Sequence, residues 1–125
     1  MLIDTDVLIW MTRGHTGAAT RLQAMTPWRI SAVTYMELAQ GCRNKRELER
    51  IKKGLMLCQT EILPLGAAIS DRAMQLIDAY ALSHGMQVGD ALIAATALEH
   101  GLTIFTANAK HFAPVDDLRI EIFAP

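Results

Sequence analysis

Three carboxylates, Asp4, Glu37 and Asp90, each lie where an apolar run gives way to a stretch with helical spacing. In an open parallel α/β sheet the carboxyl ends of the strands gather along one edge, and ligands bind there. Acids far apart in the sequence would therefore meet in space. Several carboxylates in one crevice repel each other unless a cation joins them. The pattern predicts a metal site, and with it metal-dependent chemistry on phosphates.

Each acid also has a purely structural explanation. Asp4 and Asp90 are good N-cap candidates, and Thr34 with Glu37 matches a capping box. Capping explains one acid at one helix start, but not three acids at the predicted edge of one sheet. Helix N-termini also keep carboxylates ionised. Oxygen ligands of this kind favour a hard ion, Mg²⁺ or Mn²⁺.

Other polar residues fall near the same predicted edge. We predict that Asp6 faces the crevice or caps the first helix. Thr106 and Asn108 follow another apolar run, and we expect them to be secondary ligands or to position water. None of the four histidines fits a metal-ligand spacing, and His111 is the most interesting because of these neighbours.

The elements that must position these residues alternate along the chain. Short apolar runs predict buried strands at Leu2–Asp4, Arg29–Val33, Glu61–Leu65, Leu102–Thr106 and Arg119–Phe123. Helical patterns fill the intervals, at Asp6–Arg13, Ala18–Met25, Thr34–Cys42, Asn44–Leu57, Ala67–Ser83 and Asp90–His100. This alternation predicts an α/β fold with a parallel sheet. Neither a dinucleotide-binding fingerprint nor a P-loop is present, so either the acids carry the chemistry or the chain carries none.

Length and composition bound the possibilities. The 125 residues predict a single domain, 1–125, and the composition, 51% hydrophobic and 20% charged, is ordinary for a compact globular protein. With no apparent signal peptide or membrane span, and two cysteines without metal-ligand spacing, we expect a cytoplasmic protein. The formal net charge of −1 excludes a polycation. A basic segment, residues 43–53, is a solvated helix face unless it borders the acidic crevice, where it would contact RNA.

Four blocks of the sequence, in order, resemble PIN-domain ribonucleases, especially toxins of the VapC type. The blocks are residues 1–9, 30–41, 89–97 and 100–108, and the resemblance covers essentially the whole chain. It implies a three-layer α/β/α fold with a central parallel sheet of about five strands. It further implies Mg²⁺- or Mn²⁺-dependent endoribonuclease activity on RNA, a homodimer, and a cognate antitoxin whose tail blocks the active-site groove.

The resemblance also assigns roles to individual residues. Asp4, Glu37 and Asp90 correspond to the family's acidic triad, in which Asp4 and Asp90 would bind the metal. Glu37 would be a further ligand or would orient the attacking water. Many members carry a fourth acid where this chain has Asn108 or His111. The remaining sources of that charge are the adjacent acids Asp116 and Asp117.

Two other functions compete with this one. Asp4 and Asp6 form a D-x-D at a strand end, as in phosphatases that form an aspartyl-phosphate on the first acid. That interpretation gives Glu37 and Asp90 no role, and the chain is short for such a fold. The third possibility is a non-catalytic domain that binds RNA or protein, suggested by Asn108 in place of an acid.

Overall fold

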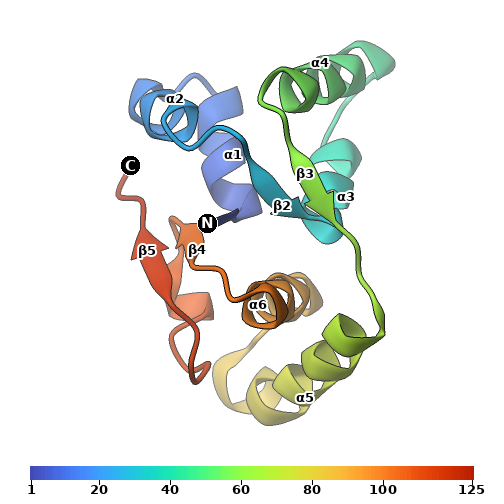
Figure 1. The fold of residues 1–125 in the computed structure, drawn as a ribbon, viewed down its shortest axis with the longest axis vertical. Helices are drawn as coiled ribbons and strands as arrows, with labels where there is room; N and C mark the ends of the chain where they lie inside the picture. The colour runs from blue at the N-terminus through green and yellow to red at the C-terminus, as the bar shows by residue number, and fades with distance from the viewer.

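The computed structural model describes residues 1–125 and confirms the α/β class (Figure 1). The elements in chain order are β1 (Leu2–Ile3), α1 (Thr5–Thr12), α2 (Thr16–Gln23), β2 (Arg29–Ser31), α3 (Ala32–Gln40), α4 (Lys45–Leu57), β3 (Glu61–Leu63), α5 (Ala67–His84), α6 (Val88–His100), β4 (Ile104–Thr106), the short 3₁₀ helix η1 (Ala109–His111) and β5 (Ile120–Ile122).

All strand pairs are parallel, but the strands form two sheets rather than the predicted single sheet of about five. One sheet has the order β1-β4-β5, and the other pairs β2 with β3. β1 and β2 are neighbours without a hydrogen-bonded ladder. The reason is the shortness of β1: Asp4 already begins a helix after two strand residues, so little backbone remains to pair on its second edge.

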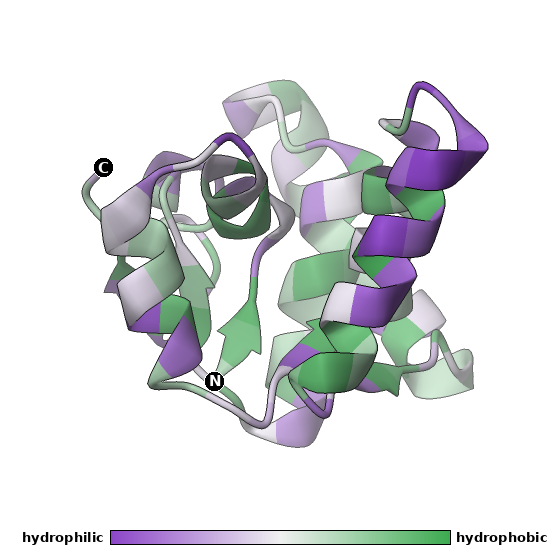
Figure 2. Cartoon of the chain, turned by 90° about the horizontal axis from the view of Figure 1, so that it is seen from above, coloured by the Kyte–Doolittle hydropathy of each residue, from purple (hydrophilic) through white to green (hydrophobic).

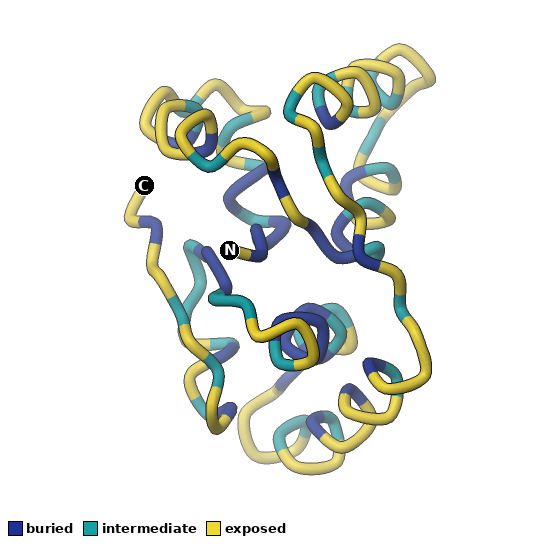
Figure 3. Tube along the Cα trace, viewed as in Figure 1, coloured by how far each residue is buried: buried dark blue, intermediate teal, exposed yellow.

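Alternate residues of the strands face opposite layers of helices. Leu2 and Ile104 belong to a buried cluster shared with α5 and α6, whereas Ile3 and Phe105 pack with α1 and α2. The period of two along a strand therefore sends successive side chains into different cores. The strand layer lies between these two cores (Figure 3), which confirms the expected three-layer arrangement.

Two helices show how burial follows composition. α6 is buried at almost every position from Ala91 to Ala97, as its apolar sequence predicts, and it ends at Gly101 in the left-handed conformation (φ 64°). In contrast, α4 buries only Leu55 and carries a hydrophilic outer side (Figure 2). No helix combines the length with the apolar character that a membrane span requires.

Candidate active site

Asp4 stands at the junction between β1 and α1 and is 7% exposed. Its backbone N–H donates to the carbonyl of Phe105 at 2.9 Å, so the ladder between β1 and β4 extends to this residue. Its side chain caps α1, with Oδ1 accepting the backbone N–H of Thr5 at 2.8 Å. The predicted cap is therefore confirmed, and its second carboxylate oxygen faces away from the cap.

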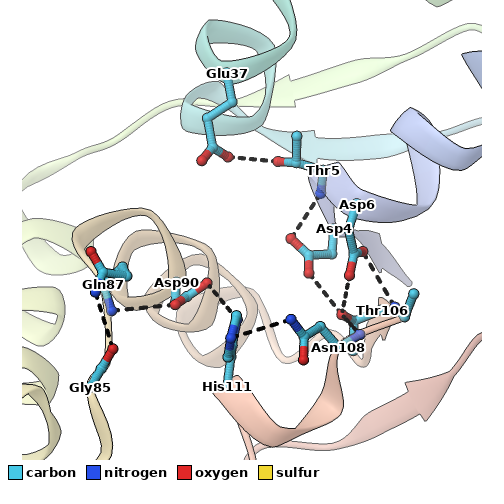
Figure 4. A network of polar contacts seen from close by, with 11 residues as sticks. Asp4, Thr5, Asp6, Glu37, Gly85, Gln87, Asp90, Thr106, Asn108 and His111 are labelled. Carbon is cyan, nitrogen blue, oxygen red and sulfur yellow. Dashed lines mark hydrogen bonds and ion pairs between the residues drawn. The ribbon is translucent and has the colours of Figure 1, made fainter. Parts of the chain in front are cut away.

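Thr106 joins two carboxylates at the end of β4 (Figure 4). Its hydroxyl lies 2.8 Å from Asp4 Oδ2 and 3.3 Å from Asp6 Oδ2, and it also accepts the backbone N–H of Asn108 at 3.0 Å. Asp6 is held from the other side by the backbone N–H of Ala107, 3.3 Å from Oδ1. Because one hydroxyl carries one hydrogen, Thr106 satisfies only one of the two acids at a time. The parallel pairing of β1 with β4 thus brings Asp4, Asp6 and Thr106 together, as predicted.

The electrostatics of this pair are unfavourable. Burial, and after it the charge of Asp6, raise the pKa of Asp4 from 3.8 to about 7, against the hydrogen bonds from Thr106 and Thr5. None of the five ion pairs in the chain involves Asp4 or Asp6. Two adjacent carboxylates without a cationic partner are oxygen donors suited to a hard divalent ion. The residues therefore fit Mg²⁺ or Mn²⁺.

Glu37 approaches from α3. Its Oε1 accepts the hydroxyl of Thr5 at 2.6 Å, and that hydroxyl also contacts Thr34 at 3.1 Å. The capping-box interpretation of Thr34 and Glu37 is wrong, because α3 begins earlier, at Ala32, and Ser31 caps it through the N–H of Val33. Thr34 is instead buried inside the site.

Glu37 also lies against the start of α6. A methyl group added at Gly89 would sit 2.9 Å from Glu37 Oε2, so this glycine makes room for the carboxylate.

Asp90 occupies the third position of α6 rather than the N-cap that the sequence suggested. Gln87 is the N-cap, and its backbone N–H donates to Asp90 Oδ2 at 3.3 Å. The reason for the difference is that Val88 and Gly89 already have helical conformation, which moves the helix start two residues earlier. Asp90 Oδ1 lies 3.6 Å from His111 Nδ1.

Asn108 and His111 belong to the turn after β4. Asn108 is the N-cap of η1 and its Nδ2 lies 3.2 Å from His111 Nε2. Asp116 and Asp117, the alternative sources of a fourth charge, lie farther along in an exposed turn, with Asp117 at a φ of 65°, and take no part in the network of Figure 4. Asn108 and His111 therefore join the site at the position where the resemblance predicted a fourth acid.

Figure 4 draws Glu37, Asp4 and Asp90 on three sides of one open area, contributed by α3, the start of α1 and α6. The acids do not converge further, since no three His, Cys, Asp or Glu side chains form a metal-holding group. Asp4 and Asp6 are the close pair, while Glu37 and Asp90 are held by Thr5, Gln87 and His111. Sequence reasoning missed Thr5, whose only signal was its position between the two acids of the D-x-D.

A groove leads away from Glu37. It has a volume of about 770 Å³ and runs between α1, the end of α2 and the α3–α4 segment. Apolar residues such as Leu8, Leu38 and Ile51 line it, and Arg13, Arg43 and Arg50 flank it. Part of the basic segment 43–53 therefore shares this groove with Glu37, the one acid of the site that lines it.

The whole chain has known relatives. Residues 1–118 match the family model of the PIN domain. Ribonuclease VapC10 of Mycobacterium tuberculosis is 33% identical over 129 residues, which cover 100% of this chain and 95% of that protein.

The chain belongs to the PIN-domain family.

Solved structures share its fold, and the resemblance to PIN-domain ribonucleases seen in the sequence is confirmed. A chain of a toxin-antitoxin complex from Klebsiella pneumoniae superposes with a TM-score of 0.78 at 30% identity, covering 94% of this chain and 93% of that one. A chain of DNA-bound VapBC from Salmonella typhimurium gives a TM-score of 0.78 at 26% identity, covering 97% and 96%. In this fold Asp4 follows β1, Glu37 lies within α3, Asp90 is the third residue of α6, and Thr106 is the last residue of β4.

Proposed function

We propose that this PIN-domain protein is a metal-dependent endoribonuclease and the toxin of a toxin–antitoxin pair. The observation that carries the proposal is the pairing of buried Asp4 with half-buried Asp6, in which the pKa of Asp4 is raised to about 7 and neither acid has an ion-pair partner in the protein. Its family and its similarity to Ribonuclease VapC10 support a nuclease. A bound divalent ion would relieve the repulsion between the two acids.

Asp4, Asp6 and Asp90 would hold Mg²⁺ or Mn²⁺, with Glu37 on the opposite side of the open area. Such an ion, when bound, activates water and neutralises charge on a scissile phosphate. Glu37 accepts a proton from the attacking water or orients it, since its Oε2 has no hydrogen-bond donor in the protein. Asn108 would hold water or a phosphate oxygen in line with the attack, whereas Thr106 is fully buried and positions Asp4 and Asp6 through its hydroxyl.

RNA would reach the acids along the groove. Arg13 on one wall and Arg43 and Arg50 on the other supply positive charge beside Glu37, although Glu47 offsets Arg43 through a 2.9 Å ion pair. A chain with a net charge of −1 must hold RNA by such local charges.

The same groove suits an antitoxin. The structural relatives include toxin-antitoxin complexes, and an apolar groove that ends at Glu37 fits a partner segment that covers the acid.

We further propose that two copies pair through α5 and α6, where Met74 and Val88 are 60% and 66% exposed beside a second apolar hollow. As a nuclease acting on cellular RNA, the protein would work in the cytoplasm.

Cleavage of a labelled RNA tests the proposal. Wild-type protein is expected to cleave with Mg²⁺ or Mn²⁺ and to stop when EDTA is added, and Asp90→Asn is expected to lose at least a hundredfold in rate. Asp71→Asn, an exposed acid of α5, serves as the control and keeps full activity. Cleavage that survives EDTA, or that survives Asp90→Asn, would contradict the proposal. RNA binding without cleavage would favour the non-catalytic function.

A further inference from the structure

His111 lies between two residues of the site and has no role in the proposed function. Its Nδ1 is 3.6 Å from Asp90 Oδ1, and its Nε2 is 3.2 Å from Asn108 Nδ2. The His111 side chain is 41% exposed and that of Asp90 is 17% exposed, so the contact is partly shielded from water. Asn108 and His111 are three residues apart across η1, the spacing at which a 3₁₀ turn places side chains on one side.

The amide of Asn108 determines which ring nitrogen of His111 carries the proton. Nδ2 of an asparagine is a donor, so the ring nitrogen beside it must accept. In a neutral imidazole the proton is then on the other nitrogen, Nδ1, which faces the Asp90 carboxylate. The opposite tautomer would set a lone pair against a carboxylate oxygen. At 3.6 Å the contact is electrostatic rather than a full hydrogen bond.

Asp90 is thereby held at both oxygens. The backbone N–H of Gln87 donates to Oδ2 at 3.3 Å, and His111 presents its Nδ1–H toward Oδ1. The first contact comes from the start of α6, the helix that carries Asp90. The second comes from the turn that follows β4, and Thr106 is the last residue of that strand. The orientation of Asp90 is therefore linked to the strand end where Asp4 and Asp6 meet.

We propose that His111 is a positioning residue: Asn108 selects its Nδ1–H tautomer, and this N–H fixes the orientation of the Asp90 carboxylate, which would be one of the ligands of the divalent ion. Asn108 thus acts through His111 in addition to any contact with water or phosphate. The role of Asp90 rests on the proposed function, but the tautomer does not, so the two ideas fail separately.

The tautomer is measured by nitrogen-15 NMR of the imidazoles in the full chain, free of metal at pH 8.5, where imidazoles are ordinarily neutral. His111 is expected to carry its proton on Nδ1. His15 is an internal reference of the opposite kind, because its Nδ1 accepts the N–H of Ala18 at 3.0 Å. In Asn108→Asp the neighbour is an acceptor, and the Nδ1–H tautomer should be lost. An Nε2–H or doubly protonated His111 in the wild type, or an unchanged tautomer in Asn108→Asp, would overturn the proposal.

Calorimetry with Mn²⁺ tests the consequence for Asp90. In His111→Asn the side-chain nitrogen is attached to Cγ, as Nδ1 is in histidine, so Mn²⁺ affinity should stay within about threefold of the wild type when the donor is retained. His111→Leu keeps volume without a donor and should weaken Mn²⁺ binding about tenfold to a hundredfold, as loss of an outer partner of a metal ligand does. His100→Leu is the control, because His100 is exposed at the opposite end of α6 from Asp90.

Equal losses in His111→Asn and His111→Leu would show that only packing matters and would overturn the positioning role. Wild-type protein that binds no Mn²⁺ at all would contradict the proposed function, and the tautomer measurement would still decide the link between Asn108 and His111.

Discussion

At the scale of single residues, the site is built around a charge that the fold leaves uncompensated. Burial is the largest cause of the raised pKa of Asp4, and the neighbouring Asp6 adds to it. The folded protein consequently holds a proton on Asp4 more tightly than the unfolded chain does. A buried acid beside a second carboxylate lowers the stability of the folded protein, a cost that functional sites commonly carry.

The first prediction concerns the pH dependence of stability without metal. Because the pKa of Asp4 rises from 3.8 to about 7 on folding, its contribution is complete below pH 4 and is lost as the pH rises to 7. The loss is at most ~1.4 kcal/mol for each pH unit in that window. Asp4→Asn should remove this dependence and be more stable than the wild type by about 1–3 kcal/mol at pH 8.

Urea unfolding in EDTA between pH 4 and pH 8 measures both effects. Asp71→Asn should retain the wild-type profile, since Asp71 is exposed on α5. If Asp4→Asn keeps the wild-type dependence of stability on pH, then Asp4 is not the group whose raised pKa causes that dependence.

At the scale of elements, the position of α6 against α3 sets where Glu37 can lie. A methyl group at Gly89 would be 2.9 Å from Glu37 Oε2, whereas one at Gly54 of α4 would meet nothing within 4 Å. The atom that must move at Gly89 is the end of a flexible side chain. Its displacement therefore costs little stability but changes the site.

Gly89→Ala is expected to leave the free energy of unfolding within about 1 kcal/mol of the wild type, because the gain in helix propensity offsets the contact. Cleavage of RNA should fall about tenfold or more, because Glu37 is displaced. Gly54→Ala, inside α4, is the matched control for stability and should gain about 0.5–1 kcal/mol. Full activity in Gly89→Ala would show that the position of Glu37 does not matter for RNA cleavage.

The elements themselves were largely predictable from the sequence. Each predicted strand and helix exists, because apolar runs and Gly or Asn at helix ends are local signals. The first residues of α3 and α6 could not be predicted from the sequence. Ser31 and Gln87 are the N-caps, but Thr34 and Asp90 also match the sequence pattern of a helix start. The contact between Thr5 and Glu37 joins residues 32 positions apart and depends on helix packing, which leaves no local trace.

At the scale of the whole molecule, positive charge is distributed unevenly. Arg21, Arg29 and Arg72 each pair with a glutamate, whereas Arg13 and Arg50 flank the groove without an ion pair. The part of the basic segment that borders the groove can therefore attract phosphates, and the outward part remains a solvated face.

RNA binding should accordingly depend on which face of α4 is changed. Combined Arg13→Gln and Arg50→Gln should weaken RNA binding and lower the slope of log affinity against log salt by about 0.7 for each phosphate that the protein no longer neutralises. Lys52→Gln with Lys53→Gln removes the same charge outside the groove and should have a smaller effect. Anisotropy with labelled RNA on the Asp90→Asn background measures both, and equal effects would contradict a path along the groove.

Pairing through α5 and α6 gives a prediction for assembly. Met74→Glu places a charge in the exposed apolar surface beside Val88 and should convert a dimer into monomers in sedimentation experiments. Met56→Glu, at a residue of α4 that is 76% exposed, should remain dimeric. A monomeric wild type, or equal dissociation of the two variants, would contradict this interface.

Calorimetric titration with Mn²⁺ tests the central claim, that the Asp4–Asp6 pair is a cation site, most directly. At pH 6, below the pKa of about 7 for Asp4, wild-type protein should bind one ion and release up to one proton, seen as a dependence of the heat on the buffer. Affinity should rise from pH 6 to about pH 7, as Asp4 loses its proton, and level off above it. Asp4→Asn should bind at least a hundredfold more weakly and release no proton. Wild-type affinity in Asp4→Asn, or binding without proton release at pH 6, would contradict the account.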